Sequence, residues 1–352
     1  MTGPAEVRIG MLGSGFIGAF HADGLRYVPN TRVVANYGAG ADRRTAFAER
    51  FGSRPYDTIE GVCADPDVDL VIVSLPNHLH LEAVRAAAAH GKAVACTKPL
   101  GRDGDEAAEM LRLVEAAGVF HGYLENVVFN TEAMRMHDMI EAGAIGRLTT
   151  FRAREGHSGP HAPHFWDAEL AGGGALLDMA SHGTECARYL FGKDLAAREV
   201  VAWGATLVHG ERTTAEDNAV MIIRFEDGRA ATCDVSWSSK GGLEGRFEAY
   251  GDAGRIILDS SSTALRAFIE RPAGYLGEKT DADVGWVYPV PDETHVHGHD
   301  AMMSDTVEAF RAGRAPRETF HDGLAVNRIL DAAYRSMASG RWEPVAGSAV
   351  AA

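Results

Sequence analysis

Two polar residues in one apolar stretch, together with a lysine, have the types and spacing needed for proton transfer. Asp178 and His182 stand four apart in Leu176–Phe191, whose periodicity predicts a helix that carries both on one face. An imidazole there can take a hydroxyl proton near neutral pH, and a carboxylate can orient it. Lys98 follows an apolar run, where a lysine can stabilise charge on a substrate oxygen. From spacing alone, an exposed ion pair and a surface lysine are the more common outcomes.

A glycine loop near the start of the chain has the spacing G-x-G-x-x-G. It follows an apolar run, Val7–Leu12, that predicts a strand, and it opens a predicted helix, Phe16–Tyr27. In that context the first glycine allows a tight turn, the second lets the backbone approach a pyrophosphate, and the third lets helix and strand pack closely. The helix N-terminus then faces the phosphates. The residues of this loop expected to bind a dinucleotide are Gly13, Gly15, Phe16, Ile17 and Gly18.

The second predicted strand, Thr31–Tyr37, ends without the carboxylate that normally binds the ribose hydroxyls of NAD. Its end reads Asn36-Tyr37-Gly38-Ala39-Gly40, and Arg43 and Arg44 follow Asp42. An arginine there could bind the 2′-phosphate of NADP, or both arginines could simply be solvated residues of a helix. Gly38 and Arg43 are therefore expected near the cofactor, and the choice between NAD and NADP stays open.

Short apolar runs alternate with helical stretches as far as about residue 123, which predicts a parallel sheet with right-handed crossovers. After about residue 125 alternating runs dominate, and Glu226-Asp227-Gly228 marks a hairpin turn between two of them. We therefore predict a doubly wound α/β dinucleotide-binding domain, residues 1–125. An α+β domain with a large, mostly antiparallel open sheet should follow over residues 126–352.

Several short motifs along the chain occur together in one known family. They are Leu75-Pro76-Asn77-His78-Leu79-His80, Gly91-Lys92, Thr97-Lys98-Pro99, Gly143-Ala144-Ile145-Gly146, Gly172-Gly173-Gly174, Asp178-x-x-x-His182 and Asp322-Gly323-Leu324. By these motifs the chain resembles the Gfo/Idh/MocA oxidoreductases over nearly its whole length. The family usually has Glu-Lys-Pro where this chain has Thr97-Lys98-Pro99, so any role of that glutamate beside the lysine is lost.

The resemblance implies a two-domain subunit that binds NAD(P), and many family members are sugar or inositol dehydrogenases. It implies assembly into dimers or tetramers through the open face of the second domain's sheet. It also implies that Lys98, Asp178 and His182 are the catalytic residues and that all three contact the substrate. Further residues expected to contact the cofactor are Leu75, Asn77, His80, Lys98 and Glu125.

A cluster of basic and aromatic residues lies just before the Gly172–Gly174 turn. His157, His161 and His164 have helical spacing, but Gly159-Pro160 and Pro163 interrupt a regular helix. We expect substrate contacts from this loop rather than a metal site, because no helical or C-x-x-C frame would hold the ligands. Arg154 could bind a substrate carboxylate or pair with surface acids. The residues expected to contact substrate here are Arg154, His157, His161 and Trp166.

Composition excludes several other classes of protein. The 352 residues carry a formal net charge of −15, which gives no electrostatic footprint for nucleic acid or for a membrane surface. The longest apolar runs are too short to cross a bilayer. Four scattered cysteines, Cys63, Cys96, Cys186 and Cys233, fit a reducing cytoplasm.

We therefore expect an enzyme that moves a hydride between a nicotinamide and a secondary hydroxyl or ketone of a sugar, glycoside or cyclitol. His182 and Lys98 would remove the carbinol proton. One alternative is a redox-assisted glycosidase or lyase that keeps NAD bound, oxidises a hydroxyl transiently and eliminates an aglycone. A non-catalytic dinucleotide-binding regulator ranks last, because such proteins lose the catalytic residues that this chain keeps.

Overall fold

The chain divides into two compact units. The computed structural model describes residues 6–259, 265–290 and 292–347. The first unit comprises residues 1–130 and 297–327, and the second comprises residues 131–296 and 328–352. A single boundary at residue 125 does not describe this division, because the segment His297–Asn327 returns to the first unit.

The first unit is built on a six-stranded sheet in the order β3-β2-β1-β4-β5-β6, and every neighbouring pair is parallel. Strand order therefore reverses between β1 and β4, the place where such sheets bind ligands beyond the carboxyl ends of their strands. The order and direction confirm the doubly wound Rossmann domain. Its strands are β1 (Val7–Leu12), β2 (Thr31–Tyr37), β3 (Arg54–Tyr56), β4 (Leu70–Val73), β5 (Ala93–Thr97) and β6 (His121–Leu124).

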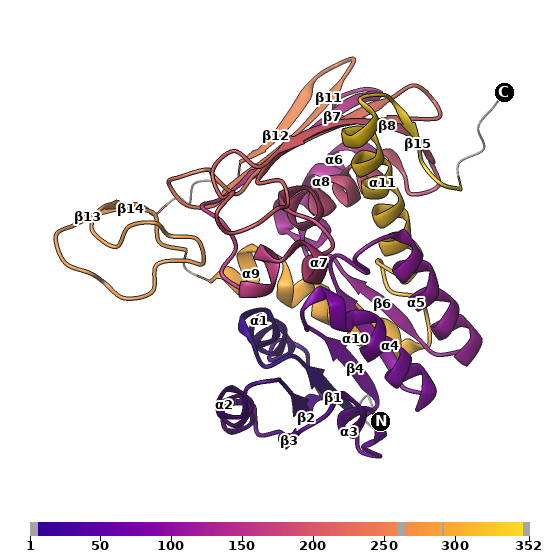
Figure 1. Cartoon of the computed structure of the whole chain (residues 1–352), viewed down its shortest axis with the longest axis vertical. Helices are drawn as coiled ribbons and strands as arrows, with labels where there is room; N and C mark the ends of the chain where they lie inside the picture. Colours follow the sequence, from indigo (N-terminus) through magenta and orange to yellow (C-terminus); the bar gives the residue numbers. More distant parts are fainter. Residues whose placement is uncertain (1–5, 260–264, 291, 348–352) are drawn as a thin grey trace. The chain divides into compact units, whose positions relative to one another are not determined.

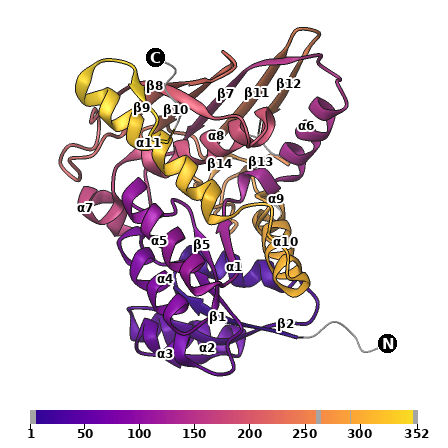
Figure 2. The same cartoon turned by 90° about the vertical axis from the view of Figure 1, so that its right-hand side faces the viewer.

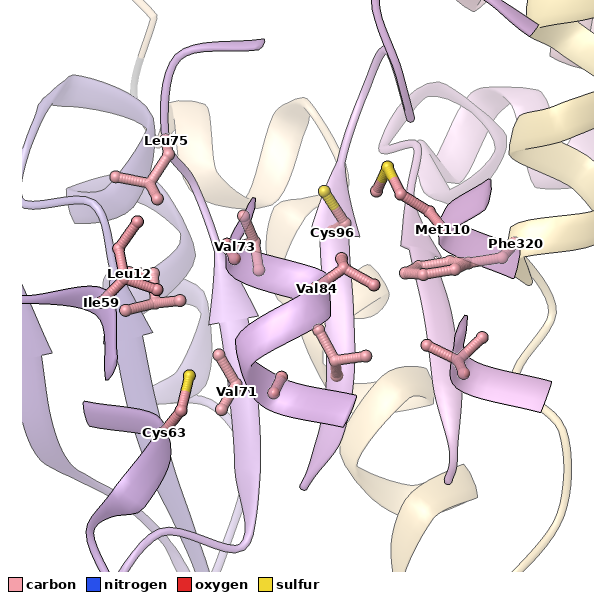
Figure 3. Close-up of a cluster of buried hydrophobic side chains, with 14 of the residues drawn as sticks. Leu12, Ile59, Cys63, Val71, Val73, Leu75, Val84, Cys96, Met110 and Phe320 are labelled. Carbon is pink, nitrogen blue, oxygen red and sulfur yellow. The ribbon is translucent and has the colours of Figure 1, made fainter. Parts of the chain in front are cut away.

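Helices of the first unit pack against this sheet, and Figure 2 shows α4 and α5 side by side. Figure 3 shows part of the core, in which Val84 of α4 and Met110 of α5 lie among strand residues such as Val73. Phe320 of α11 joins the same core. The helices are α1 (Phe16–Leu25), α2 (Ala41–Phe51), α3 (Ile59–Ala64), η1 (Asn77–Leu79), α4 (His80–Ala89), α5 (Gly104–Ala117), η2 (Val127–Phe129), α10 (His299–Ala312) and α11 (Phe320–Ser339), whose second part belongs to the second unit.

The second unit is built on a seven-stranded sheet in the order β12-β11-β7-β10-β9-β8-β15. All neighbours are antiparallel except β7 and β10, which run parallel with Gly156 opposite Ser236. The residues that follow these two strands therefore emerge at the same edge of the sheet. The strands are β7 (Leu148–Gly156), β8 (Ala197–Ala205), β9 (Asn218–Phe225), β10 (Ala230–Ser236), β11 (Glu244–Gly251), β12 (Arg255–Asp259) and β15 (Glu343–Pro344).

The two faces of this sheet differ. The buried helix α8 (Ala175–Phe191) lies against one face, and α6 (Thr131–Glu141) packs beside it (Figure 1). The approach is close, since a Cβ atom at Gly183 would lie 2.7 Å from the Cβ of Ala153. On the opposite face Trp203, Val220 and Ile222 keep between 37% and 53% of their surface exposed. This pattern matches the predicted open sheet.

Several short elements complete the second unit. The strands β13 (Ala267–Ile269) and β14 (Gly285–Val287) form a separate antiparallel pair. The short helices are η3 (Pro163–Trp166), α7 (Ala168–Ala171) and α9 (Glu293–Val296). In the described part of the chain, no helix combines the length and the apolar character that crossing a membrane requires.

Candidate active site

The three glycines of the loop after β1 have different surroundings. Gly13 has φ +121°, and a Cβ atom there would lie 2.2 Å from the carbonyl oxygen of Ser74. A Cβ atom at Gly18 would lie 2.0 Å from the carbonyl oxygen of Gly13. Packing within the protein therefore explains Gly13 and Gly18, whereas a Cβ atom at Gly15 would meet nothing within 4 Å. The open space at Gly15 fits close approach of a pyrophosphate to the helix N-terminus.

The two arginines in the first turn of α2, Arg43 and Arg44, have different environments beside this loop. A Cβ atom at Gly38 would lie 2.8 Å from the Ser14 side chain, so glycine lets β2 end close to the loop. Arg44 donates to the Gly38 carbonyl oxygen (2.9 Å) and forms an ion pair with Asp57. Arg44 is therefore structural, while Arg43 is exposed in the first turn of α2. The expectation of a cofactor contact falls on Arg43 alone.

Lys98 directly follows β5, at the carboxyl end of the sheet, and the Lys98–Pro99 peptide bond is cis. His80 holds the loop that carries this lysine. Its Nε2 lies 2.8 Å from the Leu75 carbonyl oxygen, and its Nδ1 lies 3.1 Å from the carbonyl oxygens of Pro99 and Leu100. The imidazole therefore links the segments that follow β4 and β5.

His80, which the sequence places near the cofactor, is buried in this structure. Its side chain has no exposed surface, and both of its ring nitrogens face carbonyl oxygens. Burial lowers the pKa of His80, although those carbonyls act in the opposite direction. The other residues expected near the cofactor in this unit are also buried: Leu75 is 6% exposed, Asn77 3% and Glu125 0%. Glu125 accepts a hydrogen bond from the backbone of Val127 at 3.0 Å.

The glycine-rich turn before α8 packs closely against Tyr334 and Glu216. A Cβ atom at Gly173 would lie 2.0 Å from the Tyr334 hydroxyl oxygen, and one at Gly174 would lie 2.0 Å from the Glu216 carbonyl oxygen. The carboxylate of Glu216 accepts from the backbone N–H groups of Gly174 (3.1 Å) and Leu176 (2.9 Å) and from the Tyr334 hydroxyl (2.9 Å). Burial raises the pKa of Glu216 despite these bonds. Together these contacts fix the start of α8.

Asp178 lies in the first turn of α8 and is 8% exposed, and His182 lies one turn later at 7%. The Oδ2 atom of Asp178 accepts a hydrogen bond from the indole Nε1 of Trp237 at 3.0 Å. The Nε2 of His157 lies 3.9 Å from the same oxygen. The sequence prediction missed Trp237, because only the parallel pairing of β7 with β10 places it beside His157.

The remaining residues of the histidine-rich loop have separate contacts. His161 Nε2 lies 2.7 Å from the Glu278 carbonyl oxygen, and the His164 ring lies 4.3 Å from that of Phe165. The guanidinium carbon of Arg212 sits 3.7 Å from the centroid of the Trp166 ring. Arg212 thus covers part of one face of the Trp166 ring.

Arg154 lies on the face of the sheet that is opposite α8. Its neighbour Ala153 packs against Gly183 of that helix, and successive strand residues point to opposite faces. The guanidinium forms ion pairs with Asp234 (2.6 Å) and Glu244 (3.2 Å). Of the two interpretations of Arg154, these ion pairs agree with pairing to surface acids.

A buried carboxylate holds the loop after β8 in place. Asp217 accepts backbone hydrogen bonds from Leu207 (2.8 Å), Val208 (2.7 Å) and His209 (2.7 Å). Burial alone would raise the pKa of Asp217, but these bonds outweigh it and the pKa is lowered. Ionised Asp217 therefore stabilises the folded state, in full above its unfolded pKa of about 3.9.

We expect Asp217→Asn to lower the free energy of unfolding by about 2–3 kcal/mol at neutral pH, since hydrogen bonds to a charged acceptor are lost. The difference in the free energy of unfolding between the two proteins should narrow as the pH falls through the lowered folded-state pKa of Asp217. In that range the wild type loses the stabilisation that the ionised carboxylate provides. Urea unfolding of both proteins at neutral and acidic pH measures this difference. An equal deficit at every pH would contradict it.

Comparison with known proteins agrees with the Rossmann fold and with the glycine loop after β1. Residues 7–123 match a family model described as an oxidoreductase family with an NAD-binding Rossmann fold, and residues 133–257 match the GFO/IDH/MocA C-terminal domain. A myo-inositol 2-dehydrogenase of Thermotoga maritima is 32% identical over 72% of this chain and 75% of its own length. The protein is thus a nicotinamide-dependent oxidoreductase. The chain belongs to the Gfo/Idh/MocA family, as the resemblance predicted.

Other relatives match over almost the full length. A levoglucosan dehydrogenase of Pseudarthrobacter phenanthrenivorans is 28% identical and covers 97% of this chain and 98% of its own. The crystal structure of GenD2 from gentamicin A biosynthesis, in complex with NAD, has a TM-score of 0.90 at 29% identity. It covers 97% of this chain and 96% of its own. Levoglucosan dehydrogenase in complex with NADH and levoglucosan has a TM-score of 0.81 at 26% identity.

Proposed function

We propose that this enzyme oxidises a secondary hydroxyl of a sugar, glycoside or cyclitol, or reduces the corresponding ketone. The observation that carries the proposal is the Asp178–His182 pair, nearly buried one turn apart in the first half of α8. Relatives named for levoglucosan, myo-inositol and 1,5-anhydro-D-fructose support the substrate class. All three are polyhydroxylated rings or their ketones.

In the proposed mechanism, Lys98, Asp178 and His182 act on one substrate carbinol. When bound, the nicotinamide supplies the carbon that accepts or donates the hydride. His182 takes the hydroxyl proton as general base and returns it in the reverse direction. The Lys98 ammonium donates to the same oxygen and stabilises the charge that develops there. Asp178 orients the imidazole.

The residues of the first unit fit a dinucleotide. Gly15 leaves open the space that a pyrophosphate needs, and the adjoining end of β2 has no carboxylate. We therefore keep both NAD and NADP as cofactors of the proposed reaction. In this proposal His80 positions Lys98 by holding the loop that carries it.

A substrate panel tests the proposed function. The purified protein is mixed with NAD or NADP and with sugars, glycosides and inositols, and the absorbance of reduced nicotinamide is followed. We expect net reduction with one class of polyol, and markedly slower reduction in Asp178→Asn. Altered glycosides with released aglycone and no net reduced cofactor would instead support a redox-assisted glycosidase or lyase.

We further propose that two copies of the chain associate through the open face of the large sheet. Trp203 of β8 pairs with Val220 of β9, and Val201 pairs with Ile222, which gives an apolar area on strands that face away from α8. Exposed apolar area of this kind marks interaction surfaces more often than isolated residues do. The family resemblance supports the same face.

Changing Val220 to aspartate should shift the protein toward the monomer, because a charge would be buried in the proposed interface. Size-exclusion chromatography with light scattering measures the mass. Tyr27→Asp, at a 57% exposed residue of the first unit, is the matched control and should keep the wild-type mass. A monomeric wild type, or an unchanged mass for Val220→Asp, would contradict this interface.

A further inference from the structure

We propose that Trp237 is a positioning residue that acts through Asp178. Its indole N–H fixes one carboxylate oxygen, so that the carboxylate presents a single orientation to the imidazole one turn later. This inference rests on the proposed function of Asp178 and His182, and it adds a residue to the machinery that holds them.

The hydrogen bond between Trp237 and Asp178 is buried, and only Trp237 can be its donor. Trp237 is 0% exposed, and its Nε1 lies 3.0 Å from the Oδ2 atom of Asp178. An indole offers one donor and no acceptor, so Trp237 donates and the carboxylate accepts. A hydrogen bond to an ionised acceptor in a buried setting is stronger than one between neutral groups.

Trp237 is itself held from several sides. Its backbone N–H donates to the Asp217 carbonyl oxygen (2.8 Å), and its own carbonyl oxygen lies 3.1 Å from Nε2 of His209. Its ring lies 5.4 Å from the ring of Trp166, centroid to centroid. The side chain of Asp217 in turn fixes the backbone of His209. The indole is therefore anchored independently of Asp178 and can impose an orientation on it.

His157 approaches the same carboxylate oxygen. It follows β7 as Trp237 follows β10, and its backbone N–H donates to the Ser236 carbonyl oxygen (2.9 Å). Its Nδ1 accepts the backbone N–H of Gly159 at 3.0 Å, so the neutral ring carries its proton on Nε2. That nitrogen lies 3.9 Å from Oδ2 of Asp178. Rotation of the Asp178 carboxylate would thus break its hydrogen bond from Trp237 and lengthen its distance to His157.

We expect the hydrogen bond from Trp237 to affect turnover rather than binding. A carboxylate that can rotate would orient the imidazole for only part of the time, and small misplacements of a catalytic group are costly. We expect Trp237→Phe, which keeps an aromatic ring but lacks the donor, to lower kcat roughly 10- to 100-fold. The KM for the polyol should change much less, and the calorimetric Kd for the cofactor should stay unchanged.

A double-mutant cycle tests whether Trp237 acts through Asp178. Turnover is measured for Trp237→Phe, for Asp178→Asn and for the double variant. If the inference is right, Trp237→Phe causes little further loss once Asp178 is changed. Independent, multiplicative losses in kcat would mean that Trp237 acts only through packing, and would overturn the inference. An unaffected Trp237→Phe would overturn it as well.

Two measurements distinguish failure of this inference from misfolding of Trp237→Phe and from an error in the proposed function of Asp178. If Trp237→Phe does not fold, benzothienylalanine at position 237 replaces the indole N–H by sulfur in a ring of nearly the same shape, and it should show the same fall in kcat. Wild-type turnover in that variant would overturn the inference. If Asp178→Asn alone keeps full turnover, the proposed function of Asp178 is wrong, a result distinct from failure of the cycle.

Discussion

Replacing His182 by alanine is expected to lower turnover by roughly 10²- to 10⁴-fold, the usual contribution of a positioned general base. Lys98→Met should have a loss of similar size, because the developing alkoxide loses its cationic partner. His182 is not among the residues expected to contact the cofactor, so calorimetry of His182→Ala should show unchanged binding of the cofactor. Steady-state rates with the polyol identified in the panel measure both effects.

A histidine outside the proposed site provides the control for this experiment. His137 stacks on Tyr189 at 4.3 Å between ring centroids and has no part in the proposed reaction. His137→Ala should keep turnover near the wild-type rate. Wild-type rates in both His182→Ala and Lys98→Met would contradict the assignment of the catalytic residues.

Replacing Gly15 by valine should weaken cofactor binding strongly while leaving the fold intact. The backbone at Gly15 has φ −91°, which any residue can adopt, and the protein places nothing within 4 Å of a Cβ atom there. A Cβ atom therefore fits the protein, and we expect the added side chain to obstruct the ligand rather than the fold. We expect the affinity for the dinucleotide to fall by more than about 100-fold, because backbone approach to the pyrophosphate is blocked.

Gly18→Ala is the matched comparison. A Cβ atom there would lie 2.0 Å from the Gly13 carbonyl oxygen, so this change should lower the Tm. Gly15→Val should keep the wild-type Tm. Unchanged cofactor affinity in Gly15→Val, measured by calorimetry, would show that the loop does not bind the pyrophosphate.

Much of the fold could be predicted because its signals are local. Alternating apolar runs and helical stretches predicted the parallel sheet, and the turn Glu226-Asp227-Gly228 lies between β9 and β10 as expected. The short strand β3 and helix α3 were missed, since Arg54–Tyr56 is too short and too polar for a periodic pattern. The return of His297–Asn327 to the first unit has no local signal, because it depends on packing of distant segments.

The site residues also divide into those with a local sequence signal and those that depend on tertiary contacts. Glycines with a fixed spacing carry their own pattern, whereas His80 and Trp237 gain their roles from tertiary contacts. His80 stands in a family motif, but its ring nitrogens face carbonyl oxygens that lie 5 to 20 residues away in sequence. Trp237 is 59 residues from Asp178, and a buried tryptophan is an ordinary core residue by its type.

A deuterium-transfer experiment tests the central claim most directly. The polyol that reduces the cofactor is prepared with deuterium on the carbinol carbon, and the reduced nicotinamide is analysed by mass spectrometry. The proposed function predicts deuterium in the reduced cofactor, with rates that collapse in His182→Ala. Polyol conversion without deuterium in the cofactor, or no conversion of any polyol by a cofactor-loaded protein, would contradict it.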